Sequence, residues 1–402
     1  MASTLKVDVI RGRDTTTTKL GGDLDLDGND ITGTGDIPAA NLTGTLPAIN
    51  GSSLTGISAQ KNIIINGDFD IWQRGTSVTS AADGVFLADR FKYRKVGAMV
   101  HDMDREQNAP TVAQSSHLST YSLTVDCTTI DASMAATDFC YIGQRIEGYN
   151  YRPIHTQTFT LSFWHKHTKT GTYCVSFQNY SQDRSYVAEY TQSVTNTWEK
   201  ATITVSTAPS GGGWSATTNT GIDVIWTIAA GSNYNVGTVD TWNSSNVYAT
   251  SNQVNACDST SNNFMIAQVQ LEAGSVATDF EIRNHATELA MCKRYYEEWN
   301  NAGTASYNFG IAATTSTTLG RCILVFEAEK RAAPTVTISA AGDFRCFTSS
   351  GSEDVTSLSA ADATPLTVQL TVGVAGNFIA NGSSKLQDDG NSNSRVYISA
   401  EL

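Results

Sequence analysis

The stretch TFTLSFW, residues 158–164, determines how the middle of the chain folds. In an extended chain Phe159, Leu161 and Phe163 face one side and the polar residues between them face the other. This period of two indicates a strand with one buried face. Further strand-like stretches surround it at short intervals, at 121–125, 173–177, 198–205, 222–228 and 264–271. Many short strands separated by turns predict a mainly β fold, with a jelly-roll β-sandwich over residues 61–284.

The segment that follows has the periodicity of a helix. Four apolar residues are spaced at steps of three, four and three, which places them on one stripe of a helix: Leu289, Cys292, Tyr296 and Trp299. We therefore expect a connecting helix over 285–303. Strand-like alternation returns at 321–327, 336–338, 366–372 and 396–398, which predicts a small C-terminal β domain over 304–402.

Residues 1–60 differ from the rest, because they contain no Trp, Tyr, Phe or Cys. Short units recur there as DITG at 30–33, NLTG at 41–44 and SLTG at 53–56, at spacings of 11 and 12 residues. One unit cannot bury its apolar residue alone, whereas stacked units wound from three chains can. We expect a thin trimeric β shaft that also anchors the chain; a Gly/Thr/Pro-rich linker is the alternative.

Composition excludes several classes of partner. The 402 residues include 39 acidic and 26 basic side chains, for a formal charge of −13, and no basic run occurs. Nucleic acid and anionic membrane surfaces are therefore unfavourable partners. The longest apolar run, 224–230, is far shorter than the roughly 20 residues of a membrane-spanning helix, so no membrane insertion is expected. Residues 1–14 show no apolar secretory signal.

The cysteines predict buried thiols. Their number is odd and no C-x-x-C occurs, which fits neither a zinc knuckle nor a dense disulfide framework. We expect a chain that folds in a reducing cytosol with its thiols packed as small apolar groups. The seven cysteines are residues 127, 140, 174, 257, 292, 322 and 346.

Several stretches, taken in order, resemble bacteriophage tail-fibre proteins. NIIINGDFDIWQRGTS at 62–77 and FLADRF at 86–91 look like the opening of the carbohydrate-binding-module-like jelly roll of such fibres. LSFWHKH at 161–167, TWEKATITV at 197–205 and AQVQLEAGSVATDFEIR at 267–283 are similar to its later strands. ELAMCKRYYE at 288–297 resembles the helix that follows, and the ending AEL at 400–402 resembles fibre C-termini. The opening MASTLKVDVI and the repeats look like the thin N-terminal part.

This resemblance implies a virion structural protein, made in the host cytoplasm and carried on the phage tail as a homotrimer. It implies attachment to a tail or baseplate protein through the N-terminal segment, and adhesion to a host cell-surface glycan or protein at the distal end. Two alternatives stay open. One is a capsid decoration, head fibre or tail component that never touches the receptor, and the other is an enzyme that modifies surface polysaccharide.

Glycan recognition needs aromatic faces beside amide and carboxylate groups. Aromatic residues in polar surroundings are therefore the candidates, together with a neighbouring arginine; rim or trimer-interface packing is the alternative for each. The candidates are Tyr180, Arg184, Tyr186, Tyr190, Trp214, Tyr234 and Trp242.

No metal or catalytic site is predicted. Asp23, Asp25 and Asp27 imitate the start of a calcium loop, but Thr34 stands where a bidentate acid is needed. His165 and His167 have a chelating spacing without an evident third ligand. No nucleophile elbow, zinc-protease, Walker or Rossmann motif occurs. We therefore expect no enzyme activity, catalytic residue, metal or cofactor, although paired glycosidase acids meet only in space.

Overall fold

The computed structural model describes residues 61–300, 307–349, 351–390 and 393–402. The predicted shaft, residues 1–60, lies outside the described residues. The prediction of a mainly β fold is confirmed, since the α-helices here are short: α1 is Val112–Ser115, α2 is Gly148–Tyr151 and α3 is His285–Lys293. Within the described ranges, no helix combines the length and apolarity needed to cross a bilayer.

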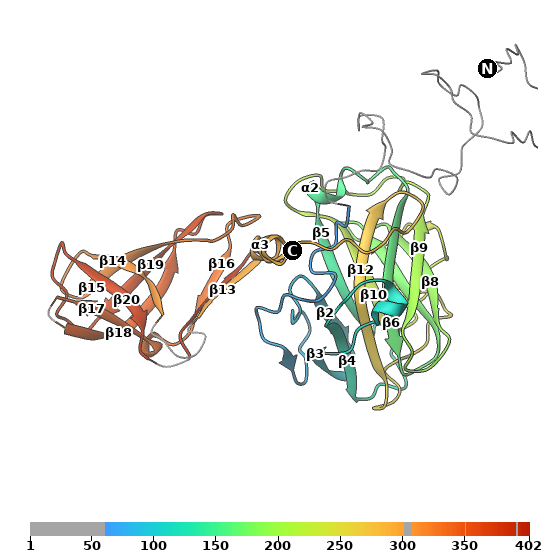
Figure 1. The fold of residues 1–402 in the computed structure, drawn as a ribbon, viewed down its shortest axis with the longest axis horizontal. Coiled ribbons are helices and arrows are strands. Elements are labelled where there is room, and N and C mark those ends of the chain that lie inside the picture. Colours follow the sequence, from blue (N-terminus) through green and yellow to red (C-terminus); the bar gives the residue numbers. More distant parts are fainter. Residues whose placement is uncertain (1–60, 301–306, 350, 391–392) are drawn as a thin grey trace, which may run out of the picture. The chain divides into compact units, whose positions relative to one another are not determined.

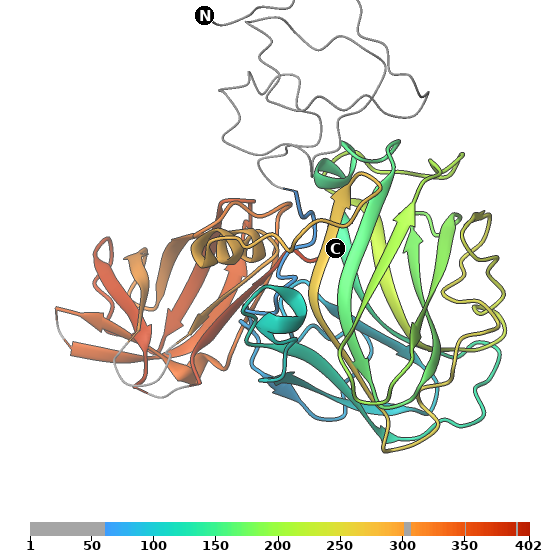
Figure 2. The same ribbon diagram turned by 45° about the vertical axis from the view of Figure 1, so that its right-hand side comes forward.

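Two six-stranded antiparallel sheets form the predicted β-sandwich (Figure 1). The first sheet has the order β1 (Ser77–Val78), β3 (Val100–Glu106), β4 (Ser122–Thr129), β12 (Asn263–Ala273), β6 (Phe159–His167) and β9 (Glu199–Val205). The second sheet has the order β11 (Trp242–Asn243), β8 (Ser185–Gln192), β7 (Gly171–Gln178), β10 (Thr220–Ala230), β5 (Phe139–Glu147) and β2 (Lys92–Val96). Figure 2 shows the long strands of the sandwich from a second direction.

The core lies between the two sheets. Phe159, Leu161 and Phe163 of β6 are all fully buried, which confirms their place on the core face. The opposite face of β6 is also buried, since Thr160, Ser162 and Trp164 are at most 9% exposed, so the prediction of a single buried face is wrong. The second sheet contributes Trp226, which is also fully buried and meets the Phe163 ring edge-on at 5.8 Å between centroids. Burying such aromatic side chains contributes much of the driving force for folding. All seven cysteines are buried and free, as the sequence predicted for thiols.

The predicted connecting helix is correct only in its first half. Helix α3 ends at Lys293, and Tyr296–Asn300 form strand β13 instead of two further helical turns. Asn284 caps the helix by accepting a hydrogen bond from the Ala286 amide at 2.9 Å. Tyr296 and Trp299 belong to the predicted helical stripe, but aromatic residues also favour an extended chain. In that conformation β13 gains a full ladder with β21 (Arg395–Ser399). Tertiary pairing therefore overrides the helical spacing.

The C-terminal part contains two β structures. A three-stranded sheet has the order β13, β21 and β16 (Thr335–Ile338). A closed barrel has the order β14 (Asn308–Thr314), β15 (Leu319–Val325), β19 (Thr367–Val374), β18 (Gly351–Ala361), β17 (Phe344–Thr348) and β20 (Ser383–Asp388). Glu297 of β13 belongs to a buried ion pair, in which Lys330 Nζ lies 2.5 Å from Glu297 Oε2. The barrel has its own apolar core, which includes Phe344, Val372 and Leu386.

Candidate functional site

A polar hollow lies on the outer face of the second sheet of the sandwich. Strand register places Gln178 of β7, Asp223 of β10 and Arg145 of β5 side by side across three strands. Alternation along β10 turns the neighbouring Ile222 and Val224 into the core, so Asp223 faces outward. The hollow has a volume of about 280 Å³. We call it the Tyr180 hollow; it is lined by Arg145, Gln178, Asn179, Tyr180, Gln182, Thr220 and Asp223.

Gln178 lines this hollow as a buried residue with one unused acceptor. Its side chain is 1% exposed, and its Nε2 donates to Asn246 Oδ1 at 2.9 Å and to the Val247 carbonyl at 3.0 Å. Its Oε1 atom is buried without a hydrogen-bond partner. A buried acceptor left unpaired costs about 1–3 kcal/mol.

Asp223 and Arg145 supply charge beside that acceptor. Arg145 Nε lies 3.2 Å from Asp223 Oδ2. Burial raises the pKa of the Asp223 carboxyl, and the neighbouring Arg145 guanidinium partly opposes this. The pair places strong acceptors and donors at one wall of the hollow, which is the arrangement that orients several hydroxyl groups at once.

A tight turn holds Tyr180 at the rim. Asn179 Oδ1 accepts from the backbone amides of Asp183 and Arg184 at 3.1 and 3.0 Å, and its Nδ2 donates to the Gly213 carbonyl at 3.1 Å. The Tyr180 side chain remains 59% exposed although it lines the hollow. Its ring therefore offers an apolar face on an ordered turn, beside buried polar groups.

Of the seven residues predicted from the sequence, the structure brings Tyr180 alone to the hollow. Arg184 secures the neighbouring loop, since its Nε donates to the Ser210 carbonyl at 2.8 Å. Tyr186 and Tyr190 are 3% and 7% exposed and belong to the sandwich core. The prediction that both rings are glycan-binding candidates in polar surroundings is wrong, because alternation along β8 turns them inward, where neither face is open to a sugar.

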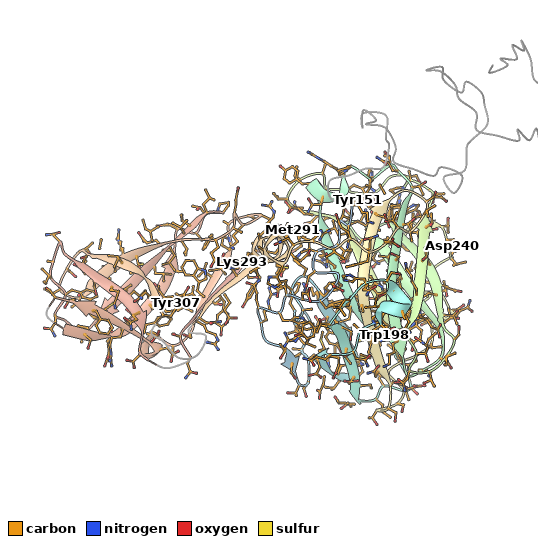
Figure 3. The ribbon with its side chains drawn as sticks, in the orientation of Figure 1. Tyr151, Trp198, Asp240, Met291, Lys293 and Tyr307 are labelled. Carbon is orange, nitrogen blue, oxygen red and sulfur yellow. The ribbon has the colours of Figure 1, made fainter. Side chains whose placement is uncertain are left out.

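The other three aromatic candidates are half-buried packing residues. Trp214 and Trp242 meet edge to face at 5.5 Å between centroids, and Trp214 also contacts Tyr151. Tyr151, which ends α2, is labelled in Figure 3. Tyr234 stacks on Tyr248 at 4.8 Å, and both rings cover part of the outer face of the second sheet. These three lie apart from the lining of the Tyr180 hollow.

Sequence reasoning missed Arg145 and Asp223, because strands far apart in the chain bring them together. One signal was present: Asp223 interrupts the apolar run 222–226, IDVIW. A carboxylate inside a strand that is otherwise buried needs a partner or a ligand.

A second polar cluster lies near the start of the sandwich. His117 Nε2 lies 2.8 Å from Asp68 Oδ2, and burial raises the pKa of Asp68 to about 6. The adjoining pocket, lined by Asp68 and Asp70 among others, has a volume of only about 50 Å³. That space accepts a water or two but no sugar ring.

His165 and His167 form hydrogen bonds inside the core. His165 Nδ1 lies 2.9 Å from Gln192 Oε1, and His167 Nε2 lies 3.2 Å from Tyr190 Oη. Burial lowers the pKa of His165 to about 4 and that of His167 well below its usual value. Both side chains are therefore neutral, buried hydrogen-bonding groups at neutral pH.

Comparisons with known proteins give structural likenesses. No family model and no curated protein matches the chain. The enzymatically active domain of bacteriophage CBA120 tailspike protein 4 aligns at 13% identity and a TM-score of 0.27, over 49% of this chain and 21% of that one. TmCBM61 in complex with β-1,4-galactotriose aligns at 11% and 0.28, over 54% and 100%. A sugar-binding protein of Bacteroides thetaiotaomicron, described as putative, aligns at 11% and 0.31, over 53% and 100%. Because TM-scores below 0.5 do not establish a common fold, the sheet order itself defines the architecture.

Proposed function

We propose that the sandwich binds a glycan in the Tyr180 hollow. The observation that carries this proposal is the lining of the hollow, where the exposed Tyr180 ring lies beside the Asp223–Arg145 ion pair and the Gln178 side chain. Asp223 and Arg145 can bond adjacent hydroxyl groups, while the Tyr180 ring can stack on the CH face of a pyranose. A volume of about 280 Å³ lies at the lower end of small-molecule sites, so the hollow suits a terminal sugar or a short branch.

We further propose that the protein is a phage tail fibre that adheres to the host surface. The ordered sequence resemblance over residues 62–297 and the N-terminal repeats support this proposal. In such a fibre, a homotrimer attaches to a tail or baseplate protein through its N-terminal segment. Each site then needs only an affinity of about 1 mM, or about −4 kcal/mol, because several linked copies raise the overall avidity.

A glycan array of bacterial surface polysaccharides, followed by titration of each hit, tests the site. Tyr180→Ala and Asp223→Asn should each weaken binding at least tenfold. Tyr149→Ala is the matched control, since Tyr149 is also an exposed tyrosine of the sandwich, at 44%, but lies outside the hollow. Equal loss in the control, undiminished binding in both site variants, or no hit on the array would each refute the site.

The solution mass of the full-length chain tests the fibre. Three chains of 43.0 kDa would give about 129 kDa by light scattering. A monomer would contradict the trimeric shaft. Co-purification of the N-terminal segment with capsid instead of tail protein would favour the head-fibre alternative, and new reducing ends after incubation with polysaccharide would favour the enzyme.

A further inference from the structure

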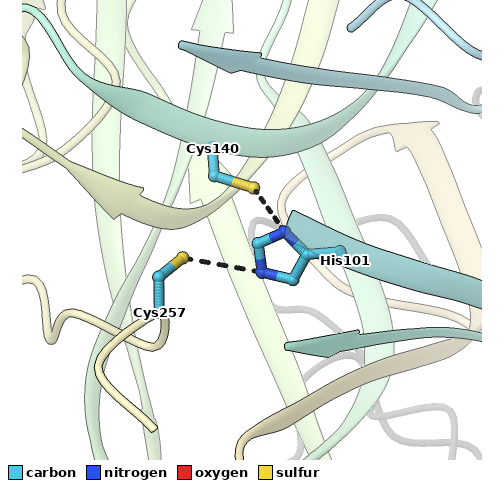
Figure 4. A group of neighbouring side chains, drawn as sticks. All are labelled: His101, Cys140 and Cys257. Atoms are coloured by element: carbon cyan, nitrogen blue, oxygen red, sulfur yellow. Dashed lines mark hydrogen bonds between the residues drawn. The ribbon is translucent and has the colours of Figure 1, made fainter. Parts of the chain in front are cut away.

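The polar groups around His101 in the sandwich core bond one another. Cys257 Sγ lies 3.6 Å from its Nε2 and Cys140 Sγ lies 3.9 Å from its Nδ1, so the two thiols lie against different ring nitrogens (Figure 4). Tyr93 Oη also lies 2.6 Å from Nδ1, and all four side chains are at most 1% exposed. The cations beside the Tyr180 hollow differ from this cluster, because they reach solvent with donors that are not used.

Arg145, which lines the Tyr180 hollow, is held at one edge of its guanidinium only. Its Nε lies 3.2 Å from Asp223 Oδ2, and its side chain is 26% exposed. Neither Nη atom has a hydrogen-bond partner among the described residues, and neither is buried away from water. A guanidinium fixed through Nε keeps a planar pair of donors at its other edge, and this pair matches the two oxygens of a carboxylate.

Lys92 places a second cation close to Arg145. It begins strand β2 opposite Gly143 of β5, and Arg145 follows Gly143 by two residues on the same outer face. Residues in this diagonal relation lie about 7–8 Å apart, within reach of long side chains. Burial lowers the pKa of Lys92, and the positive charges of Arg145 and Arg94 lower it further. The two cations therefore act on the same region of the sheet.

The charges in this region leave one cation in excess. Arg145 pairs with Asp223, and Arg94 Nε lies 2.8 Å from Asp83 Oδ1. No carboxylate of the described residues lies within ion-pair distance of Lys92, although the chain as a whole carries a formal charge of −13. A local excess of positive charge on an acidic protein favours an anionic ligand. One unpaired cation matches one singly charged group, such as the carboxylate of an acidic sugar.

We propose that the sugar bound in the Tyr180 hollow is acidic, with its carboxylate on the Nη edge of Arg145 and close to Lys92. This inference rests on the proposed glycan site and names the ligand class of that site. A hydrogen bond between two charged partners is roughly twice as strong as a neutral one, so the carboxylate gains more at this edge than a hydroxyl group does. Asp223 stays on the Nε side of the guanidinium and accepts hydrogen bonds from hydroxyl groups of the same sugar.

Carboxyl reduction tests this ligand class without any variant of the cations. Each array glycan that loses affinity in Tyr180→Ala is titrated against the wild-type protein before and after its carboxylates are reduced to hydroxymethyl groups. Reduction should weaken binding at least tenfold. Raising NaCl from about 50 to about 500 mM should weaken binding of the native glycan and leave that of the reduced glycan unchanged, because salt screens charge.

Variants of Lys92 test the contribution of the second cation. Lys92→Gln should weaken binding of the native glycan about threefold or more and leave binding of the reduced glycan unchanged, while Lys92→Arg should retain the wild-type affinity. Lys200→Gln is the matched control, since it removes the same charge from an exposed position on β9 of the other sheet. Equal losses in Lys92→Gln and Lys200→Gln would overturn the role of Lys92.

Failure of the ligand class can be told apart from failure of the site. Glycans that depend on Tyr180 but bind equally well before and after reduction would overturn the acidic ligand and leave the glycan site standing. Tyr180-dependent glycans whose only anionic group is a phosphodiester would overturn the carboxylate in the same way. An array with no Tyr180-dependent glycan would refute the glycan site, and this inference with it.

Discussion

Acid should destabilise the sandwich through His165. This side chain is 1% exposed between the sheets, and burial lowers its pKa from 6.5 to about 4. The unfolded chain therefore binds a proton at a pH where the folded chain does not. Stability from the neutral imidazole is present above pH 6.5 and is lost as the pH falls toward 4. At 1.36 kcal/mol per pKa unit, the full loss is about 3 kcal/mol.

Comparison with a non-titrating variant isolates this effect from other groups. The free energy of unfolding in urea is measured for wild type and His165→Gln between pH 7.5 and 4.5. The wild-type value should fall by about 2.5 kcal/mol more than the variant's over this range, whatever the offset at neutral pH. Curves for wild type and His165→Gln that run parallel within about 0.5 kcal/mol would refute the reasoning.

Two further predictions concern packing. Lys330→Met leaves the Glu297 carboxylate buried without its cation, so the free energy of unfolding of the C-terminal part should fall by about 3 kcal/mol or more in a urea titration. The exposed Lys200→Met should change the free energy of unfolding little in the same titration. Gly67→Ala would place its Cβ 2.1 Å from a backbone carbonyl oxygen of β12, and should cost about 1–3 kcal/mol. Gly376→Ala has no atom within 4 Å of the added Cβ and serves as its control; equal melting temperatures for the two alanine variants would contradict the steric argument.

The local hydrophobic pattern predicted the strands in which buried residues recur at every second position. Phe159, Leu161 and Phe163 needed only the period of two to be assigned to the core, and β6 follows that prediction. The helix prediction failed after Lys293, because Tyr296 and Trp299 satisfy a helical stripe and a strand equally well. Pairing with β21 decided between them, and a ladder between residues about a hundred positions apart leaves no local trace.

For the functional residues, too, some properties follow from the sequence and others only from the tertiary structure. The sequence by itself determined that Tyr180 lies in a polar, turn-rich stretch and that the cysteines are buried, since both follow from neighbouring residue types and composition. Only the tertiary structure decided that Asp223 and Arg145 flank Gln178, and that Cys140 and Cys257 approach His101. Antiparallel register and the packing of two sheets set these distances, and both are properties of contacts between distant segments. The proposed glycan site depends on the convergence of residues in space, which no single stretch of the chain encodes.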